Sequence, residues 1–464
     1  MPPSQHPVPP SRRSFLRDGG LLLAGGALGG GSANRAQAVP PRGTSDSAPA
    51  APLCHVGGGE RLRLGLVGCG RRGTQLALDC LAVGGDGVEW VAMADLFADR
   101  IQQAFRTLRG RFPGAASQHM HRLAGIDAFR DLLGLDLDAV VLATPPAFRP
   151  QHFEAAVAAR KHAFLERPIA VDAPGVRRVR FAGDVARRLG LTVRVGFRHR
   201  HDPRYQEAIS RIRDGEIGRV IFANATCQRG SIRARPRPPE MSPWEYQLRH
   251  WPRYAWLGGD PLVEHHVQQL DVIRWAFDGC PLACQGQGGR EGLAGDLLGQ
   301  CFDHHALEFV FPEDMRLWSQ TRQRDGCRRI ACEQVHGTEG VCDLATGTFR
   351  GRADGRTWSV GTRPDLARSM ANRNHRKGAS ESCLRQMDSF LRAIRQGDDR
   401  DELGQAADST LLAIMGRMAS HSGRPITWAQ AQASDETLVG PLGPGIPQGP
   451  GNLHGRWPAV SETA

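Results

Sequence analysis

The fold of this chain is decided by the stretch Leu64-Gly65-Leu66-Val67-Gly68-Cys69-Gly70-Arg71-Arg72-Gly73, in which a short apolar run ends in the pattern G-x-G-x-x-G. A helical pattern of apolar residues follows at once over residues 76–81, so the order is strand, glycine turn, helix. Gly68 can adopt the backbone angles of the tight turn, Gly70 lets the main chain approach a pyrophosphate, and Gly73 lets helix and strand pack closely. The free N–H groups at the start of the helix then face the phosphates. The stretch predicts a dinucleotide-binding site, and an ordinary glycine turn is the alternative.

A second apolar strand, residues 88–94, ends in Asp95. A carboxylate at this strand end suits the ribose 2′-hydroxyl of NAD and would repel the 2′-phosphate of NADP. The sequence therefore predicts NAD as the cofactor, unless Asp95 is an ordinary surface residue.

Strand and helix patterns alternate from Arg61 to about Gly190, with further buried-type strands at residues 138–144 and 162–166. This alternation predicts a parallel sheet with right-handed crossovers. Ligands of such sheets bind beyond the carboxyl ends of the strands. We therefore expect the glycine turn, Asp95 and the segments 144–146 and 166–168 to converge on one crevice.

Composition indicates a globular protein of two or three domains: 464 residues, of which 40% are hydrophobic and 23% charged. The formal net charge of +11 comes without an aromatic-basic stripe or a helix-turn-helix or zinc-finger spacing, so we predict no nucleic-acid partner. The positive charge should still attract anionic substrates. Eleven cysteines cannot all pair within one chain, and no C-x-x-C pair is present. Buried thiols are expected, with one or two disulfides as an alternative.

The first residues read as an export signal. Residues 11–17, S-R-R-S-F-L-R, fit a twin-arginine motif, residues 21–28 are mildly apolar, and Ala36-Gln37-Ala38 is a cleavage site of the A-x-A type. We predict a signal peptide over 1–38 and a linker over 39–60, with export to the periplasm or the extracellular space; a disordered basic tail is the alternative. The apolar segment is too short for a membrane span. Folding before export would leave cysteines free.

Four segments carry a resemblance to a known family: G-C-G-R-R-G at 68–73, M-A-D-L-F-A-D-R at 93–100, A-T-P-P at 143–146 and K-H-A-F-L-E-R-P at 161–168. In this order and spacing they resemble the glucose–fructose oxidoreductase, inositol dehydrogenase and rhizopine-catabolism family (Gfo/Idh/MocA), and the resemblance runs from Arg61 to at least Phe277. The twin-arginine signal and the segment Gly258-Gly259-Asp260 are similar to exported members.

The resemblance implies an α/β protein: an NAD-binding Rossmann domain over 61–190, then a C-terminal α/β domain over 191–432 with a large, mostly antiparallel sheet, then a flexible tail over 433–464. One face of that sheet would form a homo-oligomer, and the other would cover the nicotinamide. The implied cofactor-binding residues are Gly68, Cys69, Gly70, Arg72, Gly73, Asp95, Arg100, Thr144, Pro145, Glu166 and Arg167.

The chain departs from the family at both positions that handle protons. The family's Glu-Lys-Pro is here Glu166-Arg167-Pro168, and an arginine binds and polarises but does not lose its proton in proteins. In the family's acid-x-Gly-x-His-x-x-Asp pattern, Glu264 stands at the acid, His266 at the glycine and Gln268 at the histidine. On a regular helix Glu264, Gln268 and Asp271 would share one face.

Three explanations stay open for the proton chemistry. His265 or His266 could substitute if the segment is not a regular helix, or one of Tyr205, His199 and His201 could supply it, or the site could bind a sugar without turnover. Each of these side chains could equally be structural. His152 could line the nicotinamide pocket or cap its helix. No metal is predicted, because adjacent histidines diverge on a helix and no H-x-x-x-H spacing accompanies them.

The resulting hypothesis is an exported oxidoreductase that acts on a sugar or polyol by hydride transfer at a tightly bound NAD. Arg167 would polarise the substrate oxygen, and Glu264, His265, His266 and Gln268 would surround the sugar. One alternative is an NAD-dependent glycosidase: some exported relatives cleave glycosides by transient oxidation and elimination. Another is a non-catalytic, nucleotide-containing sugar-binding protein.

Overall fold

A computed structural model describes residues 61–114, 119–231, 236–291, 301–361, 380–398 and 400–439. All of them fall in one compact unit that spans Ala50–Ala464. The predicted signal peptide over 1–38, the linker over 39–60 and residues 440–464 lie outside the described residues.

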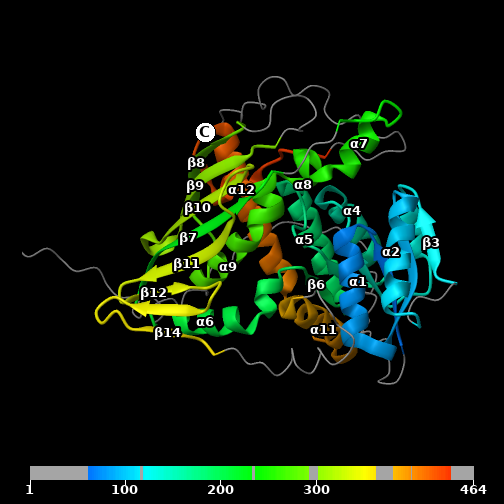
Figure 1. Ribbon diagram of the computed structural model, residues 1–464, viewed down its shortest axis with the longest axis horizontal. Coiled ribbons are helices and arrows are strands. Elements are labelled where there is room, and N and C mark those ends of the chain that lie inside the picture. Colours follow the sequence, from blue (N-terminus) through cyan, green and yellow to red (C-terminus); the bar gives the residue numbers. More distant parts are fainter. Residues whose placement is uncertain are drawn as a thin grey trace, which may run out of the picture. The chain divides into compact units, whose positions relative to one another are not determined.

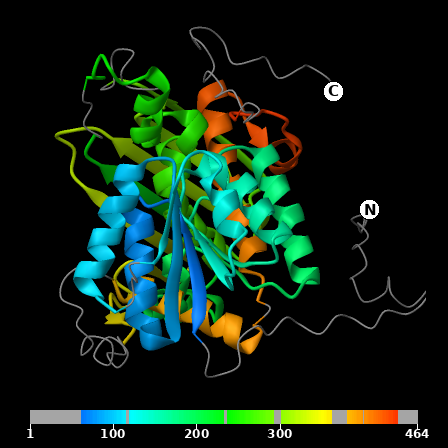
Figure 2. The ribbon, with the colours of Figure 1, turned by 90° about the vertical axis from the view of Figure 1, so that its right-hand side faces the viewer.

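The first half of the unit is a six-stranded parallel sheet with the strand order β3-β2-β1-β4-β5-β6 (Figures 1 and 2). The strands are β1 (Leu62–Val67), β2 (Val88–Asp95), β3 (His121–Ala124), β4 (Ala139–Leu142), β5 (His162–Leu165) and β6 (Val193–Val195). The crossover helices are α1 (Arg71–Gly84), α2 (Ala98–Arg111), α3 (Ala128–Leu133), α4 (Arg149–Ala158) and α5 (Ala173–Arg188). This is the predicted Rossmann architecture, and the strand order reverses between β1 and β4, where such sheets bind ligands.

The Rossmann sheet extends past the predicted boundary at residue 190. Val193 and Val195 are buried, and β6 pairs in parallel with β5 through Ala163↔Val193 and Leu165↔Val195. The domain boundary predicted at residue 190 is too early, because β6 has only three residues, too few for a periodic sequence pattern to be recognised.

The second half is a nine-stranded sheet with the order β14-β13-β12-β11-β7-β10-β9-β8-β15 (Figure 1). Its strands are β7 (Val220–Arg229), β8 (Ala283–Gly289), β9 (His304–Val310), β10 (Arg316–Gln323), β11 (Ile330–Gly337), β12 (Gly340–Asp343), β13 (Thr348–Gly351), β14 (Thr357–Ser359) and β15 (Ile426–Thr427). Every pair is antiparallel except β7 with β10. The expectation of a large, mostly antiparallel sheet is confirmed.

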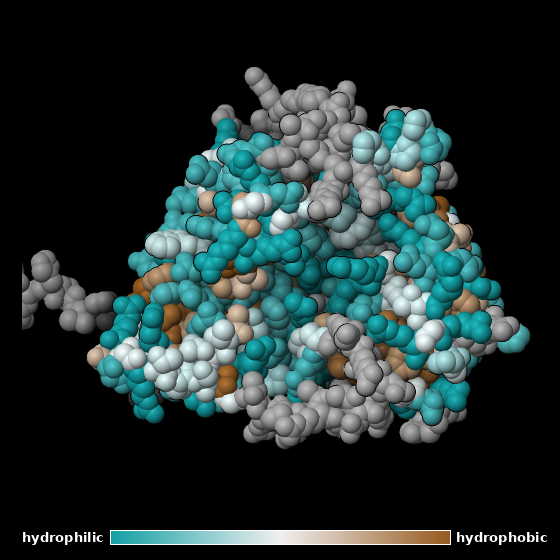
Figure 3. All heavy atoms as spheres, viewed as in Figure 1, coloured by the Kyte–Doolittle hydropathy of each residue, from teal (hydrophilic) through white to brown (hydrophobic). Residues whose placement is uncertain are grey.

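Helices cover one face of this large sheet, which we call its inner face. They are α9 (Val267–Phe277) and α12 (Glu402–Ser422), which pack on β7, β11, β8 and β9. Along β7 the side chains of Ala223, Ala225 and Cys227 are buried in alternation, as expected for a strand with one covered face. The other helices of this half are α6 (Pro203–Arg213), α7 (Pro243–Arg249), α8 (Ala255–Gly258) and α13 (Trp428–Ala433). The surface in the view of Figure 1 is mostly hydrophilic (Figure 3).

Helix α11 (Glu381–Gln396) returns from the C-terminal half to the Rossmann domain and packs on α1. Phe390 meets Phe164 of β5 at a ring-centroid distance of 5.6 Å, and the Met387 sulfur lies 3.4 Å from that of Cys80. The amphipathic apolar patterns of residues 383–394 and 406–418 lie within α11 and α12. The two halves therefore share a core.

The first residues of the predicted flexible tail are anchored. The Leu438 N–H donates to the Asp172 carboxylate at 2.8 Å, and the Arg177 guanidinium donates to Asp435 at 2.8 Å. Polar contacts with α5 hold this segment in place. The Pro/Gly-rich composition of the residues that follow it gave no indication of these contacts.

Ten cysteines lie in the described segments and all are free thiols, most of them buried. Within these segments the predicted alternative of one or two disulfides is wrong. No helix of the described chain has the length and apolar character that a bilayer crossing requires.

Candidate active site between the two sheets

A cavity of about 820 Å³ lies between the Rossmann sheet and the inner face of the large sheet. Its lining comes from the glycine turn after β1, from the ends of β2 and β4, and from the start of α9 and the strands β7 and β11. The carboxyl ends of the parallel strands thus open onto it, as the sequence predicted.

The glycine turn has the geometry of a cofactor cradle. Gly68 has φ +98°, and a Cβ there would lie 2.6 Å from the carbonyl carbon of Ala143. A Cβ on Gly73 would lie 1.9 Å from the Gly68 oxygen, so Gly73 is required for packing of α1 and does not line the cavity. Nothing lies within 4 Å of a Cβ on Gly70, which leaves that backbone open to a ligand. The residues present therefore fit a dinucleotide.

Asp95 at the end of β2 is bound to the glycine turn. Its carboxylate accepts hydrogen bonds from the Cys69 N–H at 2.7 Å and the Phe97 N–H at 2.9 Å. Burial raises the pKa of Asp95, and these two backbone donors oppose the shift. The carboxylate lines the cavity with acceptor capacity left for a ribose hydroxyl.

The structure brings most of the predicted cofactor residues together. Those that line the cavity are Gly68, Gly70, Arg72, Asp95, Arg100, Thr144, Pro145, Glu166 and Arg167. The predicted cofactor-binding role of the Cys69 side chain is wrong. Its thiol is buried in the Rossmann core, 3.6 Å from the Ala94 carbonyl oxygen, and only its N–H supports the turn, by a hydrogen bond to Asp95. The side chain packs in the same apolar cluster as Leu64 and Leu66 of β1 and therefore does not reach the cavity.

Glu264 and Arg167 form the centre of the substrate end. A nitrogen of Arg167 lies 3.8 Å from a carboxylate oxygen of Glu264, and Arg167 also donates to the Glu264 backbone carbonyl. The other Glu264 oxygen is buried and has no hydrogen-bond partner among the described residues. Burial raises the pKa of Glu264 to about 7, although Arg167 and Arg149 oppose the shift. Buried polar atoms are normally satisfied, so a ligand donor is expected there.

Glu264 belongs to a π-helical turn over Leu262–His266 that leads into α9. The turn follows Asp260, a buried residue whose carboxylate contacts His305 at 2.7 Å and His421 at 3.2 Å. These anchors hold the turn against β9 and α12. π-Helical turns are frequent at functional sites, and this one interrupts the regular helix assumed from the sequence.

The predicted substrate residues of this segment do not all face the cavity. Glu264, His265 and Gln268 line it, and the Gln268 side-chain nitrogen is buried without a partner within the described chain. The predicted place of His266 at the substrate is wrong. His266 is fully buried, and its ring lies 2.8 Å from the Ser319 hydroxyl of β10. Adjacent side chains diverge on a helix, so His265 and His266 cannot share one site. Asp271 is held by Arg200 at 2.8 Å and Ser409 at 2.6 Å.

Of the open alternatives for proton chemistry, His199 and Tyr205 line the cavity and stack at a ring-centroid distance of 4.5 Å. His201 points elsewhere, to Glu402 at 3.9 Å. His152 lines the cavity 3.0 Å from the Thr144 hydroxyl. Burial lowers the pKa of His152, His199 and His265 to about 3, so all three are neutral rings near pH 7.

Sequence reasoning missed Glu333 and Arg229. Glu333 of β11 is 1% exposed and accepts a hydrogen bond from the Tyr205 hydroxyl at 3.1 Å; burial raises its pKa to about 7. Arg229 ends β7 and contacts the Nδ1 atom of His265 at 3.2 Å. In both strands every second side chain faces the cavity side of the sheet, and both residues occupy such positions. A charged residue at a position where the pattern predicts an apolar one could therefore have revealed them.

Arginines outnumber carboxylates in the lining. The arginines are Arg71, Arg72, Arg100, Arg149, Arg167, Arg198 and Arg229, and the carboxylates are Asp95, Glu166, Glu264 and Glu333. Arg72 pairs with Glu166 at 2.9 Å. In the described parts of the chain no group of three or more histidine, cysteine or acidic side chains is arranged to hold a metal ion.

Residues 62–197 match the oxidoreductase family with an NAD-binding Rossmann fold, Gfo/Idh/MocA. This domain belongs to the Gfo/Idh/MocA family. The match ends at residue 197, two residues after β6, in agreement with β6 as the sixth Rossmann strand.

Two curated relatives are similar to part of this chain. An inositol 2-dehydrogenase of Acidothermus cellulolyticus is 29% identical over 218 residues, 47% of this chain and 54% of that protein. A glycosyl hydrolase family 109 protein of Shewanella sp. (strain ANA-3) is 31% identical over 162 residues, 34% of each chain. The matches thus span about half or less of these relatives.

Solved structures show the same two-domain fold. Levoglucosan dehydrogenase, in a complex with NADH and levoglucosan, has a TM-score of 0.62 at 18% identity; the likeness covers 80% of this chain and all of that one. A scyllo-inositol dehydrogenase of Lactobacillus casei with bound NAD(H) and scyllo-inositol has a TM-score of 0.58 at 17% identity, with the same coverage of both chains.

Proposed function

We propose that this protein is an NAD-dependent oxidoreductase that acts on a CH–OH group of a sugar or polyol. The observation that carries the proposal is the buried carboxylate oxygen of Glu264 that has no hydrogen-bond partner among the described residues. Glu264 lines the same cavity as the glycine turn, and its other carboxylate oxygen lies 3.8 Å from a nitrogen of Arg167. A substrate hydroxyl supplies the missing donor. The dehydrogenase relatives, which are named for polyols and an anhydrosugar, favour this substrate class.

The chain's own residues divide the work as follows. Glu264 accepts the hydroxyl proton, because its pKa near 7 leaves it partly ionised at neutral pH. Arg167 donates hydrogen bonds to the substrate oxygen as its charge develops. A dinucleotide held at the glycine turn and Asp95 would supply the acceptor for the hydride that leaves the carbinol carbon, and the alcohol would become a carbonyl group. Gln268 and His265 bind the remaining hydroxyls.

Two alternatives rest on separate observations. The similarity to a glycosyl hydrolase family 109 protein favours a glycosidase that works by transient oxidation and elimination. The replacement of the family's lysine and histidine by Arg167 and Gln268 favours a nucleotide-containing sugar-binding protein without turnover.

We also propose that the protein is exported by the twin-arginine route with NAD tightly held, and that it acts in the periplasm or outside the cell. Residues 11–17 and the cleavage site at 36–38 support export. A pathway that carries folded proteins would let the chain load its nucleotide before it leaves.

The test starts with protein purified after export without added nucleotide. Denaturation followed by mass spectrometry of the released small molecules should yield NAD in equal amount to protein. NADH formation is then measured on sugars and polyols, and cleavage on glycosides. Oxidation supports the first reading and cleavage without net NADH supports the glycosidase. Failure to bind NAD at all would contradict every catalytic version.

A double variant, Arg167→Lys with Gln268→His, separates the catalytic from the non-catalytic reading. If the wild type is inactive and the double variant forms NADH, the natural residues have abolished catalysis. If the wild type turns over and the double variant gains nothing, Glu264 suffices as the proton acceptor.

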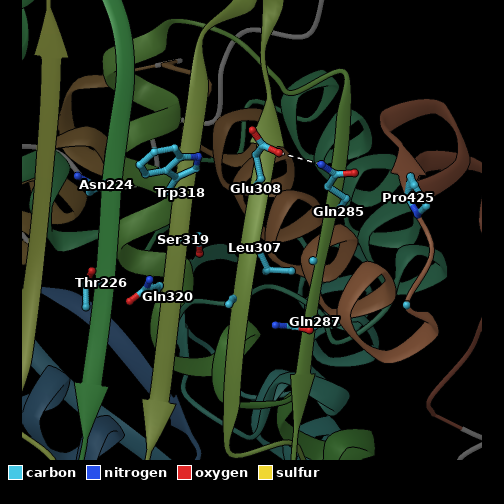
Figure 4. Close-up of a pocket in the computed structure, with 13 residues that line it drawn as sticks. Asn224, Thr226, Gln285, Gln287, Leu307, Glu308, Trp318, Ser319, Gln320 and Pro425 are labelled. Atoms are coloured by element: carbon cyan, nitrogen blue, oxygen red, sulfur yellow. Dashed lines mark hydrogen bonds between the residues drawn. The ribbon is translucent and has the colours of Figure 1, made fainter.

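We further propose a homo-oligomer formed through the outer face of the large sheet. Figure 4 shows this face over β7, β10, β9 and β8, where a hollow of about 590 Å³ is lined by Trp318 and polar side chains such as Gln285 and Glu308. Trp318 is 54% exposed, and Gln285 donates to Glu308 at 2.8 Å. Aromatic residues such as an exposed tryptophan are enriched in protein interfaces.

A further inference from the structure

The substrate end of the cavity carries guanidinium groups without matching acids. Arg229 contacts the neutral ring of His265, and neither Arg229 nor Arg198 forms an ion pair with any described carboxylate. The positive charges of Arg229 and Arg167 act on the same two groups. Both add to the effect of burial in lowering the pKa of His265, and both oppose the rise of the Glu264 pKa. Arg198 acts in the same way on Glu333.

The carboxylates at this end do not compensate. Glu264 and Glu333 face the three arginines, but burial raises the pKa of both to about 7, so each is partly neutral at physiological pH. Glu166 is already paired with Arg72. The substrate end therefore holds a net positive charge.

Other arginines lie where the cofactor phosphates would bind. These phosphates would lie at the glycine turn, where Arg71 and Arg72 begin α1 and Arg100 lies in the first turn of α2. Arg229 ends β7 of the large sheet, and Arg198 opens the turn Arg198–His201 after β6.

We propose that the substrate is an anionic sugar or polyol, one that bears a carboxylate or a phosphate which Arg229 and Arg198 bind while Glu264 and Arg167 contact the reacting hydroxyl. Arginine suits this role because its planar fork matches carboxylate and phosphate oxygens in pairs. The roles of Glu264 and Arg167 in this inference rest on the proposed function. The preference for an anionic substrate rests only on the arginines that line the cavity.

The test compares matched probes on the NAD-loaded protein: D-glucose with D-glucuronate and with D-glucose 6-phosphate, and D-galactose with D-galacturonate. Thermal shift measures binding, and NADH formation measures turnover. At least one anion should raise the melting temperature at concentrations where its neutral partner does not. Uronates and the sugar phosphate, tested in parallel, distinguish the two sources of charge.

Variants then locate the charge. Arg229→Gln and Arg198→Gln should each weaken binding of the preferred anion by about fivefold, because both arginines are exposed and an exposed ion pair contributes little more. The matched control is Arg213→Gln, a surface arginine paired with Asp278, which should keep wild-type binding. The preference should also weaken as salt rises.

The inference is overturned if every neutral sugar binds as tightly as its anionic partner, if no probe of either class binds, or if the preference survives both cavity variants. Anion binding without NADH formation or glycoside cleavage would instead contradict the proposed function and leave the anionic class standing. The two proposals therefore fail separately.

Discussion

At the scale of single residues, the site depends on acids whose environment moves their pKa into the working range. Glu333 is buried in the cavity wall and the side chain of Glu264 is only 14% exposed, and burial raises the pKa of each to about 7. The histidines of the wall are shifted in the opposite direction by the same burial, so they are poor proton acceptors. Carboxylates, and not imidazoles, are the candidate bases here.

The pH dependence of turnover tests the role of Glu264. Because Glu264 must be ionised to accept a proton, kcat/KM should rise with pH through about 7 and level off above it. Glu264→Gln should reduce kcat by at least about a hundredfold and remove this rise. Steady-state rates across the pH range provide the measurement, with Glu216→Gln as the surface control. A wild-type profile without a limb near neutral pH would exclude Glu264 as the base.

Glu333 offers a stability measurement that is independent of substrate. Its folded-state pKa of about 7 lies above its ordinary value of 4.5, so its contribution to stability is full below 4.5 and is lost as pH rises through about 7. In Glu333→Gln this loss is absent. Thermal melts should therefore show the variant and the wild type close together at low pH and the variant more stable above pH 7, by up to about 3 kcal/mol. A gap that does not change with pH would contradict the buried acid.

At the scale of elements, the β1–α1 turn and the strands β7 and β11 build the two walls of the cavity. The turn was predictable because its glycines are set by local sterics and their spacing is short-range. The strand residues Arg229 and Glu333 were harder to find: the alternation indicates which face they occupy, but which helices cover that face depends on contacts far apart in the sequence.

Two glycine variants separate architecture from binding in the turn. Gly73→Ala places a Cβ 1.9 Å from the Gly68 oxygen, so the variant should fold poorly or unfold at a lower temperature than wild type. Gly70→Ala meets no protein atom within 4 Å, so it should keep the wild-type fold but bind NAD at least about tenfold more weakly. Circular dichroism melts and calorimetric NAD titration give the two readouts. Wild-type NAD affinity in Gly70→Ala would show that no phosphate approaches this turn.

At the scale of the whole molecule, the described chain is held together by segments that return. Helix α11 comes back to pack on α1, and residues 434–439 come back to α5, so neither half is complete without the other. Neither of these returning segments covers the outer face of the large sheet. Trp318 lies on that face beside Phe222, at a ring-centroid distance of 5.4 Å.

The oligomer proposal is tested by Trp318→Glu, which should shift the assembly to a smaller species in light scattering, because a charge in the centre of an interface opposes association. Phe181→Glu is the matched control: Phe181 is 69% exposed but lies on α5, so this variant should keep the wild-type size. A wild-type monomer, or an unchanged assembly in Trp318→Glu, would contradict the proposal.

The sequence by itself determined the Rossmann order and the glycine turn with Asp95, because these follow from local backbone sterics and short-range periodicity. The two segments that carry Arg167 and Glu264 were expected at the substrate only from the family resemblance. The tertiary structure decided the rest. The π-helical turn put His265 in the cavity and His266 in the core, and the large sheet brought Glu333 and Arg229 to the substrate end. Such placements depend on packing between elements that lie more than a hundred residues apart along the chain, as Tyr205 and Glu333 do, and on the desolvation that only a closed cavity imposes on its acids.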